Sequence, residues 1–149
     1  TTTITRKSGS NTYNKMYYSY DNESWTTWAS GTTLTLDIDD ILYVKGDAPC
    51  LANSSYSLYA FTSTDETPCL SVHGNINCLV ANNTPTTHKF ESVFSNCYNL
   101  IDASDLLLPD TEIETYYYQS MFAGCKNLKY APKILLQKKN LPAHHTSEV

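Results

Sequence analysis

Few side chains of this protein carry charge. Charged residues make up only 17% of the chain, and 15 Asp and Glu outnumber 10 Lys and Arg, so the formal net charge is −5. Nonspecific nucleic-acid binding depends mainly on positive side chains that neutralise phosphates, so this balance argues against a nucleic-acid partner. No apolar run approaches the roughly 20 residues of a membrane-spanning helix, and the sequence therefore predicts no membrane insertion.

The motifs of common catalytic and metal sites are also missing. The sequence contains no Gly-rich phosphate loop, no G-x-S-x-G and no H-E-x-x-H. None of the cysteines form a C-x-x-C pair, which argues against a structural zinc site. Asp37, Asp39 and Asp40 are close in sequence but lack the spaced acidic loop and distal Glu of a calcium site. We therefore predict no enzyme activity, no cofactor and no bound metal.

The cysteine count is odd, which excludes complete pairing within the chain. The five cysteines are Cys50, Cys69, Cys78, Cys97 and Cys125. We expect Cys97 and Cys125 to be packed thiols, because free cysteine behaves as a small buried apolar residue. A bridge from Cys50 to either Cys69 or Cys78 in an oxidising compartment stays open as an alternative.

Tyrosine is abundant where charge is scarce. The chain has 12 Tyr against 4 Phe and 2 Trp, and Thr, Ser and Asn are also frequent. Tyrosine combines a large apolar ring with a polar tip, which suits half-exposed sheets and interfaces. This composition is typical of a β-rich extracellular or virion surface protein, and we predict a location on a cell surface or on a virion.

One pattern occurs twice in the second half of the chain. The residues Phe94-Ser95-Asn96-Cys97-Tyr98-Asn99-Leu100 return 28 positions later as Phe122-Ala123-Gly124-Cys125-Lys126-Asn127-Leu128. A fixed period of 20–50 residues is the signature of stacked repeats, each of which buries its apolar face against the next. We expect a shared repeat core in which equivalent side chains lie over one another. Its members are Phe94, Cys97, Leu100, Phe122, Cys125 and Leu128.

This pattern, F-x-x-C-x-N-L-x-x-A, follows a Tyr-rich segment that ends in Ser120-Met121-Phe122 and resembles the BspA-like leucine-rich repeats of Bacteroides-type surface proteins. The resemblance covers roughly the last third of the chain, and Leu141-Pro142-Ala143 looks like the opening of a third unit. It implies surface binding or adhesion and supplies no catalytic residues.

The first half of the chain predicts short strands separated by turns. The expected strands are residues 15–20, 25–28, 33–38, 41–45, 56–62, 69–72 and 76–80. Several short strands at such spacing predict a β-sandwich or a meander. The order of the Tyr-rich hairpin and the strands after it also resembles the β-domain that precedes BspA-like repeats.

The polar linker at 81–85 gives the expected domain boundary. We predict a β-rich domain at 1–80 and BspA-like repeats at 81–149, with about two units and a partial third. Apolar residues at i, i+3 and i+4 predict short helices over 86–94 and 114–122. Asn96 and Gly124 follow them, where a left-handed cap is expected. The predicted fold class is thus α+β, a β-sandwich or meander followed by a short leucine-rich-repeat solenoid.

Aromatic side chains give the candidate contact residues. One group, on or near the predicted hairpin, is Tyr17, Tyr18, Trp25 and Trp28, and the other is Tyr116, Tyr117 and Tyr118. Successive residues of a helix point about 100° apart, so the three adjacent tyrosines cannot all face inward on one. Exposed Tyr and Trp rings stack on sugars and anchor protein interfaces. The alternative for Trp25 and Trp28 is that they fill the small β core.

The leading hypothesis is a non-enzymatic surface module for binding or adhesion that recognises a protein or a glycan. The alternative is a structural virion protein, such as a fibre, head decoration or tail component of a phage that infects gut bacteria. Its partners would be other virion subunits, including copies of itself as a homo-oligomer.

Overall fold

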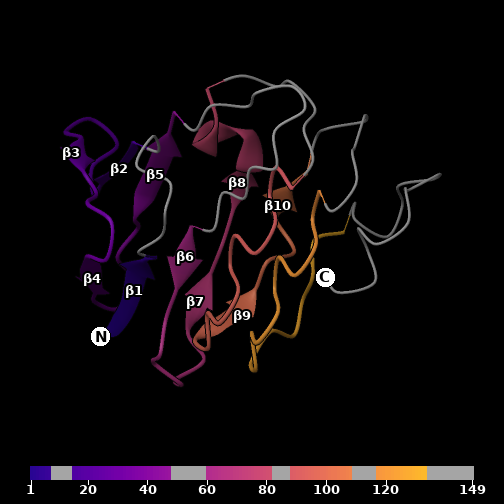
Figure 1. Ribbon diagram of the computed structural model, residues 1–149. Coiled ribbons are helices and arrows are strands. Elements are labelled where there is room, and N and C mark those ends of the chain that lie inside the picture. The colour runs from indigo at the N-terminus through magenta and orange to yellow at the C-terminus, as the bar shows by residue number, and fades with distance from the viewer. Residues whose placement is uncertain (8–14, 48–59, 82–87, 109–116, 134–149) are drawn as a thin grey trace.

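The computed structural model describes residues 1–7, 15–47, 60–81, 88–108 and 117–133 (Figure 1). These residues are β-rich, with ten short strands in four small sheets, one 3-10 helix and no α-helix. The elements are β1 (Thr2–Arg6), β2 (Met16–Ser19), β3 (Thr26–Thr27), β4 (Thr33–Leu36), β5 (Tyr43–Gly46), β6 (Phe61–Thr62), β7 (Leu70–Ser71), β8 (Gly74–Asn75), η1 (Ile76–Leu79), β9 (Leu100–Asp102) and β10 (Leu106–Leu107). No helix in the described part of the chain is long and apolar enough to cross a membrane.

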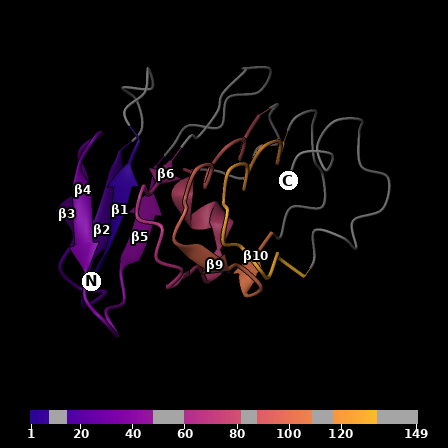
Figure 2. The ribbon, with the colours of Figure 1, turned by 90° about the horizontal axis from the view of Figure 1, so that it is seen from below.

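Two antiparallel sheets of three strands occupy one side of the molecule (Figures 1 and 2). In the first, with order β4-β1-β6, Ile4 pairs with Leu34 and Arg6 pairs with Phe61. The second has the order β3-β2-β5. Its strands are short and rich in Thr, Tyr and Val, residues that favour a pleated, half-buried surface.

The rest of the described chain consists of three segments that run side by side in the same direction. We call residues 60–80 the first level, 88–108 the second level and 117–133 the third level. Strand β7 pairs with β9 and β8 with β10, both in parallel, and isolated parallel bridges join Ser63 to Cys97 and Asp102 to Tyr130.

Backbone hydrogen bonds connect each level to the next. The amide of Phe61 donates to the carbonyl of Val93 at 2.7 Å, and the amide of Phe94 donates to that of Met121 at 2.9 Å. The amide of Asn96 likewise donates to the carbonyl of Ala123 at 2.7 Å. Residues on the two sides of the expected boundary at 80/81 therefore share hydrogen bonds, and the domain division itself stays a prediction.

A row of stacked aromatic rings forms the centre of the core. Ring centroids are 5.7 Å apart between Trp28 and Phe61, 5.5 Å between Phe61 and Phe94, and 5.6 Å between Phe94 and Phe122. The rings of Phe94 and Phe122 are almost parallel, 6° apart. The buried residues of all three levels and of both three-stranded sheets belong to one apolar cluster.

The two predicted helices are absent from the described residues, so the helical part of the α+β prediction is wrong there. Residues 88–94 and 117–122 are turns. The backbone at Ser92 and Ser120 is left-handed, with φ of 57° and 54°, which no α-helix tolerates in its interior. The amide of Ser92 donates to the next level instead of to its own turn.

The left-handed backbone expected at two equivalent positions is present. Asn96 has φ of 61° and Gly124 has φ of 74°. They end turns and not helices. Asn and Gly are the residues that adopt this conformation at least cost, so both levels change direction at the same place.

Candidate functional site

Three of the predicted contact residues are fully buried. Trp28 lies between Tyr18 and Phe61, and its indole nitrogen donates to the carbonyl of Thr32 at 2.9 Å. Tyr117 and Tyr118 have no exposed surface. These three side chains therefore pack the core and offer no contact surface.

The tyrosine pair of the third level packs on the second level. The ring of Tyr118 is stacked on Phe90, with centroids 6.0 Å apart and planes 9° apart, and Tyr117 meets the same Phe90 edge-on at 5.6 Å. In the predicted helix these neighbouring side chains would diverge. In the observed turn both rings point inward, while Tyr116 lies outside the described residues.

The remaining candidates divide between the two faces of sheet β3-β2-β5. Tyr18 pairs with Val44, and both pack against the core. Tyr17 pairs with Thr27 on one side and Lys45 on the other, and side chains directly opposite in a sheet share a face. Because successive residues of a strand alternate, Tyr17 lies on the face away from the core.

This second face carries three half-exposed rings and one lysine. We call these four residues the outer aromatic face: Tyr17, Trp25, Tyr43 and Lys45. Trp25 precedes Thr27 by two positions, and Tyr43 precedes Lys45 by two. The ammonium of Lys45 lies 3.9 Å from the centre of the Trp25 ring. All three aromatic rings are partly exposed and the Lys45 side chain is exposed, so this face offers apolar surface together with hydrogen-bond donors.

The turn before Trp25 is held by one carboxylate. Asp21 accepts hydrogen bonds from the amides of Ser24 at 2.7 Å and Glu23 at 2.8 Å, and from the hydroxyl of Ser19 at 2.7 Å. These bonds, the one from Ser24 most of all, hold the pKa of the Asp21 carboxyl well below its ordinary value. The ring of Trp25 therefore follows a turn whose geometry is fixed in the absence of any partner.

The six residues of the predicted repeat core all belong to, or pack against, one apolar cluster. Phe94, Cys97, Leu100 and Phe122 are buried, and Cys125 and Leu128 are half-buried against the same cluster. Burial raises the pKa of the Cys97 thiol to about 12. The two cysteines are thus un-ionised packed side chains at neutral pH, and Cys125 donates to the carbonyl of Phe94 at 3.0 Å.

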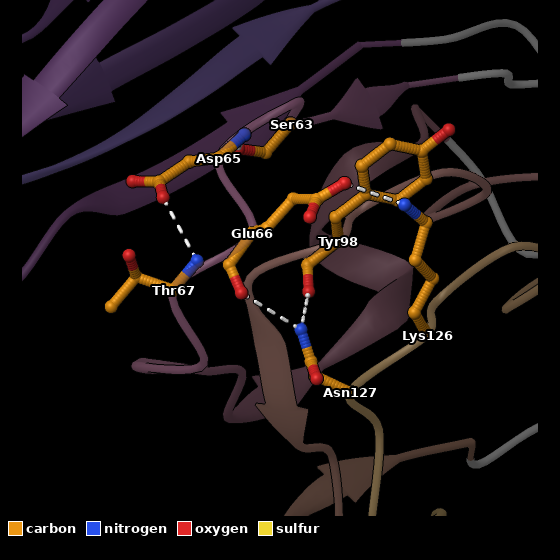
Figure 3. Close-up of polar contacts among 7 residues, drawn as sticks. All are labelled: Ser63, Asp65, Glu66, Thr67, Tyr98, Lys126 and Asn127. Carbon is orange, nitrogen blue, oxygen red and sulfur yellow. Dashed lines mark hydrogen bonds and ion pairs between the residues drawn. The ribbon is translucent and has the colours of Figure 1, made fainter.

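Polar side chains join the third level to the first across the second (Figure 3). Lys126 lies 2.7 Å from the carboxylate of Glu66 and 4.0 Å from the ring centre of Tyr98. Asn127 donates to the carbonyls of Tyr98 at 2.7 Å and of Glu66 at 3.0 Å. The Asn of the repeat motif therefore joins backbone segments of different levels.

Sequence reasoning missed a buried lysine. The ammonium of Lys7 donates to the hydroxyl of Ser95 at 2.6 Å and to the carbonyl of Ser92 at 2.8 Å, and burial lowers its pKa to about 8. Lys7 opens a polar stretch that reads as a loop, and no periodicity marks it. Among the described residues, no group of three or more His, Cys, Asp or Glu is placed to hold a metal ion.

Comparison of the chain with protein-family models, with curated proteins and with solved structures finds no match. The resemblance to BspA-like repeats therefore stays a prediction from the sequence.

Proposed function

We propose that this protein is a non-enzymatic binding module of a cell surface, and that the outer aromatic face is its contact surface. The single observation that carries the proposal is the ring of Trp25, which is partly exposed and lies against the ammonium of Lys45. An aromatic ring in a sheet loses little conformational freedom on binding. The stacked levels would serve as a frame of BspA-like solenoid repeats behind this face.

A glycan is the partner that the face suits best. Flat rings of Tyr17, Trp25 and Tyr43 offer apolar area for the C–H face of a sugar, while the phenol hydroxyls and Lys45 offer hydrogen bonds to its hydroxyl groups. Antibody combining sites use the same mixture of Tyr and Trp surface with small polar residues. A protein partner with an exposed loop is the other outcome that the test must distinguish.

The test starts from a panel of immobilised bacterial and host glycans probed with the full chain. For any glycan that binds, we expect Trp25→Ala to weaken binding at least tenfold and Tyr17→Ala to weaken it several-fold. Tyr98→Ala is the matched control, since Tyr98 is a partly exposed tyrosine of the second level that lies outside this face.

Two outcomes overturn the glycan form of the proposal. The first is a folded wild-type protein that binds no glycan on the panel. The second is a glycan whose binding Trp25→Ala and Tyr17→Ala leave unchanged. The melting temperature of each variant shows whether a loss of binding reflects a loss of structure.

A further inference from the structure

Three exposed apolar side chains gather at one end of the antiparallel sheets. Ile38 is 84% exposed, Ile41 61% and Tyr20 49%. Strand β2 ends where β5 begins, because Ser19 pairs with Tyr43. This register brings Tyr20, just after β2, beside the turn that carries the two isoleucines. Exposed branched side chains of this size on neighbouring turns form an apolar patch that water covers only at a cost.

Acidic residues adjoin this patch in the sequence. Residues 20–41 contain five acidic residues and no Lys or Arg. They are Asp21, Glu23, Asp37, Asp39 and Asp40, all exposed. We call the apolar side chains and these carboxylates together the acidic tip. Burial raises the pKa of the Tyr20 hydroxyl, and the nearby Tyr18 and Asp40 raise it further, which agrees with Asp40 lying close to the Tyr20 ring.

The turn of the acidic tip is fixed by its own hydrogen bonds. The amide of Asp37 donates to the carboxylate of Asp40 at 2.8 Å, and the amide of Asp40 donates to the carbonyl of Asp37 at 3.2 Å. Ile38 is therefore held outward before any partner arrives. A preformed apolar patch is buried on association with little cost of ordering.

A segment of opposite charge to the acidic tip is present in this same chain. Residues 126–139 contain five lysines and no acidic residue. Within the described part of that stretch, Lys129, Tyr130 and Lys133 have exposed side chains, and we call them the basic edge. Lys133 lies 3.7 Å from Asp105 in an ion pair of which both members are well exposed, so solvent weakens this contact.

The acidic tip and the basic edge lie at opposite ends of the molecule. In both ribbon views the turns that follow β2 and β4 are on the side of the N-terminal sheets, and residues 117–133 are on the other side (Figures 1 and 2). The row of rings from Trp28 to Phe122 separates them. One copy therefore cannot bring its own two patches together.

We propose that copies of this chain associate head to tail, with the acidic tip of one copy docked on the basic edge of the next. Opposite charges orient the two copies, and the isoleucines and Tyr130 supply apolar contact. This contact joins two different patches. A row of associated copies therefore has an unpaired acidic tip at one end and an unpaired basic edge at the other, unless the row closes into a ring. Self-association also fits the virion alternative, in which the partners of the chain include copies of itself.

Sedimentation velocity on the full chain tests this proposal. The patches are small compared with a standard interface, so the experiment covers concentrations up to the millimolar range. We expect the weight-average mass to rise with concentration in low salt and to rise much less in 1 M salt, where charges are screened within about 3 Å.

Two double variants separate this contact from any other. A tip variant carries Ile38→Ser and Ile41→Ser, and an edge variant carries Lys129→Glu and Lys133→Glu. We expect each to associate at least tenfold more weakly than the wild type. Mixed together they should form a 1:1 dimer and nothing larger, because the mixture holds one intact tip and one intact edge. Leu107→Ser, at an exposed leucine in neither patch, is the control.

A wild-type chain that stays monomeric at millimolar concentration overturns the proposal. So does a mixture of the tip and edge variants that forms no dimer, or that assembles beyond it. All four substituted side chains are exposed, and thermal unfolding checks each variant. If the tip variant fails to fold, Asp37→Asn with Asp39→Asn replaces it. That variant keeps the hydrogen bonds of the turn and should weaken association in low salt at least threefold, and an unchanged association overturns the proposal.

Discussion

The second and third levels carry the same sequence pattern, yet they are not equally buried. Cys97 and Leu100 of the second level are inaccessible to solvent, whereas Cys125 and Leu128, their equivalents in the third level, are half-buried. The letters of the repeat are identical at these positions. The difference therefore arises from the place of each level in the stack.

The second level is covered on two sides. Phe94 stacks between Phe61 and Phe122, while in the described residues Phe122 stacks on Phe94 alone. A repeat in a stack is stabilised by its own fold and by its contacts with each neighbour. Identical residues should therefore contribute more to stability in the second level than in the third.

The asparagines of the motif show the same contrast. Asn99 is fully buried, and its amide donates to the hydroxyl of Thr2 at 2.7 Å and to the carbonyl of Thr3 at 2.9 Å. Asn127 donates to carbonyls of the first and second levels and is only half-buried. The asparagine of the motif thus joins the second level to strand β1, whereas its equivalent joins the third level to loops of the first and second levels.

The largest expected effect comes from removing the stacked rings. Truncating a buried Phe to Ala costs about 3–5 kcal/mol. We expect Phe94→Ala to lie at the upper end of that range and Phe122→Ala at least about 1 kcal/mol lower, because Phe94 loses contacts on two sides. Urea unfolding of both variants measures the difference. Equal losses, or a larger loss for Phe122→Ala, would contradict the comparison.

A smaller effect is expected where the two levels turn. A Cβ added at Gly124 would clash with the side-chain oxygen of Asn96, the equivalent residue of the second level. The backbone at Gly124 is left-handed as well. Gly124→Ala should therefore destabilise the protein by about 1–2 kcal/mol for the left-handed strain, plus whatever Asn96 loses when it moves.

A double-mutant cycle separates the two costs at this position. In a chain with Asn96→Gly the clash is gone, so Gly124→Ala should cost only the left-handed strain of about 1–2 kcal/mol. The free energy of unfolding of the four proteins gives the coupling. A coupling of zero would mean that the Asn96 side chain does not restrict this turn.

The stacking of Phe94 on Phe122 could be predicted from the sequence. Phe, Cys and Leu recur at a fixed period, and a period implies equivalent surroundings. The first level could not be found in this way, because Phe61 precedes Phe94 by 33 residues instead of 28 and Ser63 stands beside Cys97. A changed spacing and a changed residue together remove the signal of a repeat.

The helices were predicted because apolar side chains recur at i and i+4 in both levels. Phe90 and Phe94 do lie on one side, but the residue between them, Ser92, is left-handed. Its amide reaches the carbonyl of Gln119 in the next level at 2.9 Å. Hydrogen bonds between levels thus replace those of a helix. Sequence periodicity alone does not distinguish the two, since it reports only which side chains face inward.

The exposure of two contact candidates was predicted wrongly for the same reason. Tyr117 and Tyr118 were expected to diverge, and a turn lets both face the core. Trp25 and Trp28 are three residues apart, and only the sheet register shows that one packs on Phe61 while the other meets Lys45. The sequence thus indicated the hairpin as one of two candidate groups, but it could not show which face of the hairpin is exposed.

The smallest expected effect is a change of stability with pH at the second level, where Lys7 has its contacts. Burial lowers the pKa of Lys7 from its ordinary value of 10.5 to about 8. Between these values the unfolded chain binds more protons than the folded one, so stability rises with pH by at most about 1.4 kcal/mol per pH unit. The pKa of Cys97 is raised from 9.0 to about 12, so above pH 9 the unfolded thiol releases its proton first and stability falls.

The two groups therefore act in sequence as pH rises. From pH 8 to 9 the Lys7 contribution is the larger and increases the free energy of unfolding by about 1 kcal/mol, while ionisation of the unfolded Cys97 thiol begins to offset it. Above pH 9 the Cys97 thiol increasingly offsets the Lys7 contribution, and beyond pH 10.5 the free energy of unfolding only decreases. Lys7→Met should abolish the rise, and Cys97→Ala should reduce the later fall. Urea unfolding at half-unit steps from pH 7.5 to 11 measures both slopes. A Lys7→Met variant that keeps the rise would show that Lys7 does not cause it, and would contradict the buried position of the Lys7 ammonium beside Ser92 and Ser95.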